Sequence, residues 1–131
     1  MMKVEELIEL IKAGENERVE FKSKFTKDLV EEVSALANHQ GGYILIGVTD
    51  DGKIVGTSAK DFQKISNLLQ VLHPMPKITV EKVRVDRKLV IVVKVQKCKE
   101  LVTVGGLAFI KVGKSKRPLS LDEILINWVE N

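Results

Sequence analysis

The chain has 131 residues, of which 44% are apolar and 5% aromatic, and a formal net charge of +3. This length and composition predict one domain, residues 1–131, whose core is filled by Val, Ile and Leu. The single cysteine excludes an internal disulfide, and neither an export signal nor the run of about 20 apolar residues of a membrane helix is found, so we expect a cytoplasmic protein without a membrane partner.

Hydrophobic periodicity predicts an α/β (α+β) domain, with helices packed on a mixed β-sheet in the element order αβαββαββββα. We expect helices that begin near residues 4, 26, 58 and 120, and strands at residues 18–22, 43–49, 53–55, 77–85, 88–95, 102–104 and 107–112. Residues 43–48 include no charged or amide side chain, which is typical of a strand covered on both faces. The segment 88–95 is rich in β-branched residues and is expected to be central.

Glycine and capping residues predict where several elements begin and end. Gly41 suits the left-handed residue that follows a helix. Tight turns are expected at residues 51–52 and 86–87. Ser120 and Glu123 predict a capping box for the last helix, whose apolar residues are expected to pack against the sheet.

Two segments carry a family resemblance: a short acidic strand, and a helix that ends on paired glycines before an apolar strand and an acidic turn. The matching residues are Glu15, Glu20-Phe21-Lys22, Ala37-Asn38, Gly41-Gly42, Ile46-Gly47-Val48, Asp50, Gly52, Gly56, Phe109 to Gly113 and Ser115 to Ser120. On these residues the chain resembles the divergent AlbA-like, nucleic-acid-binding domain of Schlafen proteins and of prokaryotic transcriptional regulators. The resemblance covers about residues 5–128 and implies nucleic-acid binding.

Three acidic residues form the first candidate site. Acidic residues at matching positions carry RNA cleavage in nuclease-active Schlafen relatives, and the resemblance transfers this role to Glu15, Glu20 and Asp50. Asp51 is an alternative to Asp50. Carboxylates that converge at strand ends can bind Mg²⁺ or Mn²⁺ and so activate water for phosphoryl transfer. The same residues can also be explained without catalysis. Glu15 can cap a loop, Glu20 can be a solvated strand residue, and Asp50 and Asp51 suit a hairpin turn.

Basic residues form the second candidate site. It is a loop near the C-terminus, and basic residues that follow the acidic part of the first strand extend it. Residues 82–117 hold eleven Lys or Arg against two acids, a local charge of +9, whereas the other residues carry −6. The residues expected to contact nucleic acid are Lys22, Lys24, Lys111, Lys114, Ser115, Lys116 and Arg117. Their cations and hydroxyl suit phosphate oxygens, and the scarcity of aromatic residues disfavours base stacking. The alternative to nucleic-acid binding is that these lysines only solvate the outer face of a β-hairpin.

Three functional hypotheses follow. The favoured one is a binding module, with a role in transcription or chromatin, that contacts backbone phosphates, prefers DNA over RNA and needs no cofactor. The second is an endoribonuclease that depends on Mg²⁺ or Mn²⁺, and the third is a protein-interaction domain without nucleic-acid binding. Larger relatives join this module to helicase-like or winged-helix parts, so we also expect a homo-oligomer or a partner protein.

Overall fold

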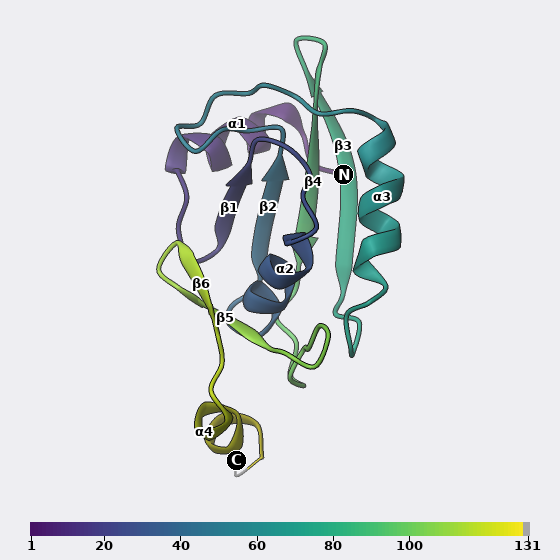
Figure 1. Cartoon of the computed structure of the whole chain (residues 1–131). Coiled ribbons are helices and arrows are strands. Elements are labelled where there is room, and N and C mark those ends of the chain that lie inside the picture. Colours follow the sequence, from purple (N-terminus) through teal and green to yellow (C-terminus); the bar gives the residue numbers. More distant parts are fainter. Residues whose placement is uncertain (130–131) are drawn as a thin grey trace.

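The structure, a computed structural model, describes residues 1–129 and is shown in Figure 1. The helices are α1 (Val4–Ala13), α2 (Leu29–Ala37), α3 (Lys60–Leu69) and α4 (Leu121–Ile124), and a π-helical turn, η1 (Leu125–Val129), continues α4. The strands are β1 (Val19–Lys22), β2 (Gly42–Ile46), β3 (Ile78–Val85), β4 (Lys88–Val95), β5 (Phe109–Val112) and β6 (Ser115–Pro118). The predicted fold class, a mixed sheet with packed helices, is confirmed.

The main sheet has the strand order β1-β2-β4-β3. β1 and β2 run parallel, with Lys22 opposite Ile46, and β4 pairs antiparallel with both β2 and β3. β4 is therefore an interior strand, as its β-branched residues predicted. Because β1 and β2 are parallel, their carboxyl ends meet at one edge of the sheet, which brings together the segments that follow Lys22 and Ile46.

Helices cover both faces of this sheet (Figure 1). α2 and α3 pack on the face that carries Ile44 and Ile46, while α1 packs on the opposite face with Leu45 and Val92. Ile44, Leu45 and Ile46 are completely buried. Successive residues of a strand point to opposite faces, so coverage on both sides explains the apolar run in β2.

Several predicted element ends are confirmed. Gly41 has a φ of +74°, and its N–H donates to the carbonyl of Leu36 at 2.7 Å, which closes the last turn of α2. Asp86 and Arg87 have φ values of +48° and +69° and form the turn between β3 and β4. The Ser120 hydroxyl accepts a hydrogen bond from the N–H of Glu123, in a capping box that starts α4.

Two predicted strands are wrong. Residues 53–55 form only an isolated bridge between Ile54 and Val48, and residues 102–104 form only isolated bridges. In the first segment the N–H groups of Val55 and Gly56 both donate to the carbonyl of Gly47. This shared acceptor ends the ladder after one bridge, so the chain continues as a loop.

The residues after the predicted strand 107–112, expected as a loop, form a second strand, β6, which pairs with β5 in a β-hairpin. Lys111 pairs with Lys116 across the two strands, and Gly113 has a φ of +60° in the turn between them. The sequence Ser-Lys-Arg-Pro of β6 lacks the β-branched and aromatic residues that usually indicate a strand. Pairing with β5 therefore determines its conformation.

The last helical segment does not pack against the main sheet as predicted. α4 lies beyond the β5–β6 hairpin, away from the four-stranded sheet (Figure 1). Leu121 and Ile126 are 70% and 57% exposed. The extended strand β6 carries the chain away from the sheet before α4 begins. Within residues 1–129 no helix combines the length and apolar character needed to cross a membrane.

Candidate nucleic-acid interface

The carboxyl end of β1 and the segments that follow β1 and β2 line one open hollow of about 260 Å³. Its lining comprises Glu20, Phe21, Lys22, Ser23, Lys24, Thr26 and Asp50. Parallel pairing of β1 and β2 therefore places Glu20 and Asp50, which are 30 residues apart in sequence, at a common hollow. Two predicted basic residues, Lys22 and Lys24, lie in the same lining. The two predicted sites are thus neighbours in space.

Glu15 and Glu20 are brought together around β1. The Oε2 atom of Glu15 accepts a hydrogen bond from the N–H of Phe21 at 3.0 Å, which fixes the loop before β1 against the strand. Burial, a hydrogen bond with the Glu15 carboxyl and the charge of Glu32 raise the pKa of Glu20 from 4.5 to about 8, and Lys111 only partly opposes them. Burial therefore favours the protonated form of Glu20, whereas the contact with Lys111 favours its carboxylate form.

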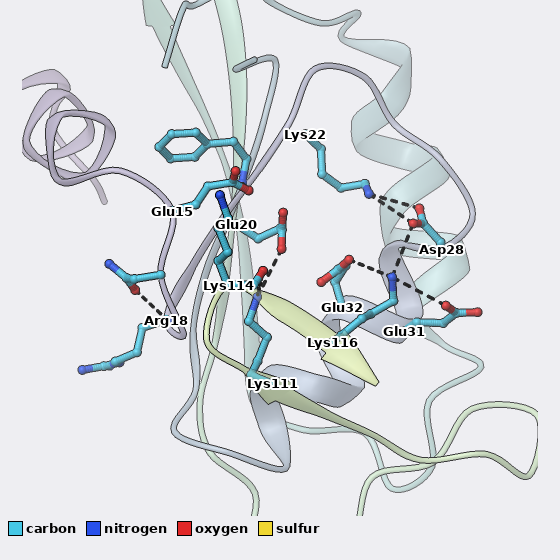
Figure 2. Close-up of polar contacts among 12 residues, drawn as sticks. Glu15, Arg18, Glu20, Lys22, Asp28, Glu31, Glu32, Lys111, Lys114 and Lys116 are labelled. Atoms are coloured by element: carbon cyan, nitrogen blue, oxygen red, sulfur yellow. Dashed lines mark hydrogen bonds and ion pairs between the residues drawn. The ribbon is translucent and has the colours of Figure 1, made fainter. Parts of the chain in front are cut away.

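Lys111 connects the β5–β6 hairpin to Glu20 (Figure 2). Its Nζ atom lies 3.1 Å from Oε2 of Glu20 and 3.1 Å from the carbonyl oxygen of Lys114, and its side chain is completely buried. Its ammonium group is enclosed by protein acceptors, so the predicted contact of Lys111 with phosphate stays a prediction that this arrangement disfavours. Lys111 instead fixes the position of the hairpin over β1.

Lys116 makes a second connection, between β6 and α2 (Figure 2). Its Nζ atom lies 2.9 Å from Oε1 of Glu32 and 3.7 Å from Asp28, which also binds Lys22 at 3.1 Å. Burial alone would lower the pKa of Lys116, but the hydrogen bond and charge of Glu32 raise it. Because Asp28 contacts both lysines, the segment after β1 and the β5–β6 hairpin form one continuous surface. We call it the hairpin surface.

The remaining predicted contacts are exposed on the hairpin surface. Lys24, Lys114 and Ser115 are exposed, and within residues 1–129 the ammonium groups of the two lysines make no ion pair. The Arg117 side chain is 48% exposed and binds both carboxylate oxygens of Glu123, at 2.8 and 2.7 Å. The cations with the fewest internal partners are therefore Lys24 and Lys114.

The predicted metal ligands do not fit a divalent ion in this arrangement. Lys111 holds one oxygen of Glu20, and the N–H of Phe21 holds one oxygen of Glu15. Among the described residues, no three or more His, Cys, Asp or Glu side chains are placed to share a metal ion. Burial also raises the pKa of Glu20, which disfavours the deprotonated carboxylate that a metal ion would bind.

Two buried polar residues of α2 were not identified from the sequence as structural elements of the site. The amide of Asn38 donates to the carbonyls of Val102 and Phe109, at 2.9 and 3.0 Å, and accepts from the N–H of Val102 at 2.8 Å. Ser34 donates to the Val102 carbonyl at 2.9 Å and accepts from the N–H of Phe109 at 3.1 Å. Ser34 lies on α2, and Asn38, four residues later, is the C-cap of that helix, so both face the same neighbour. They attach β5, and with it the hairpin, to α2.

Comparison with known proteins identifies the family. Residues 15–120 match the family model described as Schlafen, AlbA_2. The N-terminal domain of a RecG-related protein from Nitrosomonas europaea has 25% identity and a TM-score of 0.61, and the match covers 92% of this chain and 95% of that domain. The DIP2311 protein from Corynebacterium diphtheriae has 20% identity and a TM-score of 0.60 over 86% of this chain, which spans only 24% of that protein. No functionally curated protein matches. The chain belongs to the Schlafen AlbA_2 family.

Proposed function

We propose that this protein binds nucleic acid through backbone phosphates and needs no cofactor to do so. The observation that supports this most is the hairpin surface, where Asp28 bridges Lys22 and Lys116 and where Lys24 and Lys114 extend ammonium groups to solvent. Lysines directed at phosphates give affinity that depends strongly on salt and little on sequence. The family and the RecG-related neighbour, whose name refers to an ATP-dependent DNA helicase, support a function related to nucleic acid.

The test is the salt dependence of binding. Lys24→Ala and Lys114→Ala should each weaken binding to all duplex sequences to a similar extent and lower the log–log salt slope by about one unit. Lys12→Ala is the matched control, because this exposed lysine ends α1 on the other face of the sheet. An unchanged affinity and slope in the double variant would contradict the proposal. Failure of the parent to bind DNA or RNA would favour a protein-interaction domain.

Finer parts of the proposal need their own measurements. We propose that DNA is preferred over RNA, that the protein acts in the cytoplasm in the control of transcription, and that it works as an oligomer or with a partner. The helicase-related name of the neighbour supports DNA. Competition between DNA and RNA of the same sequence tests the preference, and light scattering with and without DNA tests the oligomeric state.

RNA cleavage is a second candidate function. The shared hollow of Glu20 and Asp50 favours it, because it brings two of the three predicted catalytic residues to one open site at the strand ends. The ion pair of Glu20 with Lys111 weighs against it. We therefore rank it below binding and assign no catalytic step.

A further inference from the structure

A second hollow, of about 340 Å³, lies beside the β3–β4 turn. It shares no residue with the hollow at the ends of β1 and β2. Its lining comprises Val55, Gly56, Thr57, Ala59, Arg84, Arg87, Lys88 and Leu89. Three of these eight residues are cationic and none is acidic, so the hollow is a concave positive site. This volume falls in the range of small-ligand sites, which is about 300–1,000 Å³.

The cations of this hollow are available to a ligand. Arg84 and Arg87 are exposed and make no ion pair within residues 1–129. Lys88 donates only to the carbonyl oxygen of Ile54, at 3.3 Å, a neutral partner that an anion can replace. A guanidinium group presents parallel N–H donors that match two oxygens of a phosphate.

Two nearby carboxylates do not neutralise these cations. Asp61 accepts a hydrogen bond from the hydroxyl of Thr57, a lining residue, and lies 3.9 Å from Lys64, but within residues 1–129 it makes no ion pair with the three cations of the hollow. Asp86 precedes Arg87 in the turn but is exposed and does not line the hollow. Ala59, the N-cap of α3, brings the positive end of a helix dipole to the rim.

The backbone of the turn gives an independent reason to assign a role to Arg87. Its φ of +69° follows the +48° of Asp86, so both central residues are left-handed, as in a type I′ turn. Glycine is strongly preferred at the second of these positions, because a side chain there is strained. The chain instead has an arginine whose side chain lines the cationic hollow. A strained residue that carries a reactive or binding group is typical of a functional site.

We propose that this hollow binds a phosphate group, carried either by a free polyphosphate or by a nucleic-acid backbone. Arg84 and Arg87 provide the guanidinium donors, and Lys88 provides a third positive charge from the same turn. This site is separate from the hairpin surface, so it stands or falls independently of binding there.

The decisive variant is Arg87→Gly, because it should affect phosphate affinity and melting temperature in different directions. Removing the side chain should weaken phosphate binding at least fivefold, while relief of left-handed strain should leave the melting temperature unchanged or higher. Arg84→Gln, which keeps a polar side chain but removes the charge and the guanidinium donors, is the second variant. Lys99→Ala is the charge control, since Lys99 is exposed and lies outside the lining.

The probes are inorganic pyrophosphate in calorimetric titration and a DNA duplex in fluorescence anisotropy, at low and moderate salt. Pyrophosphate binding that both variants weaken and Lys99→Ala preserves indicates a site for free polyphosphate. Absence of pyrophosphate binding, with duplex affinity reduced by both variants more than by Lys99→Ala, indicates a nucleic-acid backbone. Equal effects of all three substitutions, or no effect of Arg87→Gly and Arg84→Gln on either probe, would overturn the proposal. Failure of the hairpin surface alone would appear in Lys24→Ala and Lys114→Ala instead.

Discussion

Replacement of Asn38 by alanine tests whether buried hydrogen bonds of α2 hold the basic hairpin in place. Asn38 is 5% exposed, and its amide contacts the backbone of both Val102 and Phe109. The substitution removes the partner that Asn38 supplies to the Val102 N–H and to the Phe109 carbonyl. An unsatisfied buried backbone group costs about 1–3 kcal/mol, so the two together should cost about 2–6 kcal/mol of unfolding free energy. Domains of this size typically have about 5–15 kcal/mol of stability, so a loss of this size is a large and measurable fraction of the total.

The measurement is urea unfolding followed by far-ultraviolet circular dichroism. Asn67→Ala is the matched control, because Asn67 is exposed on α3 and bonds only a neighbouring glutamine side chain through its oxygen. It should change stability by less than about 0.5 kcal/mol. Ser34→Ala completes a double-mutant cycle, and since Ser34 and Asn38 share the Val102 carbonyl, their effects should couple by about 0.5–3 kcal/mol. A loss for Asn38→Ala no larger than that of the control would refute the reasoning.

Three further predictions follow from the same region. Because burial raises the pKa of Glu20 from 4.5 to about 8, folding stabilises its protonated form, so this contribution is present below pH 4.5 and is lost as pH rises to about 8. Thermal melts at pH 5 and 8.5 should show a smaller decrease for Glu20→Gln than for the parent, and identical decreases would contradict the shift. Gly41→Val should cost more than about 3 kcal/mol in unfolding free energy, since its Cβ would lie 2.7 Å from the Val95 carbonyl oxygen. The control Gly14→Val, at a similar positive φ but in open space, should cost about 1–2 kcal/mol. If the ribonuclease hypothesis holds, RNA cleavage with Mn²⁺ should be lost in both Glu20→Gln and Asp50→Asn, and activity that survives both removes these residues from it.

Local patterns predicted the parts of the fold that local physics determines. The apolar run of β2 predicted a strand buried on both faces, and Ile44 and Leu45 indeed lie on opposite faces under different helices. Gly41 was correctly placed because the end of a helix requires a left-handed residue that glycine adopts without strain. These features depend on a few neighbouring residues, so they can be predicted from a single sequence.

Features that depend on pairing between distant segments were not predictable in the same way. β6 has no strand-like composition and becomes a strand only because β5 pairs with it. Lys111 was expected at the surface because lysines are almost never fully buried without a partner, and its partner, Glu20, is 91 residues away. Glu32 was missed for the same reason, since a helical glutamate usually faces water, whereas this one is 6% exposed beneath Lys116.

The ion pair of Lys111 and Glu20 makes the binding hypothesis and the nuclease hypothesis compete for one carboxylate. A metal ion at Glu20 would need a carboxylate that has released the ammonium of Lys111. Release would leave a buried lysine whose other acceptor is the Lys114 carbonyl in its own hairpin, so the hairpin would lose its connection to β1. An unpaired buried charge costs several kcal/mol, which metal binding would have to exceed. The same pair positions the hairpin that presents Lys114 to solvent. Metal binding at Glu20 would therefore disrupt the contact that positions the hairpin surface, which is the physical reason to rank the nuclease hypothesis below phosphate binding.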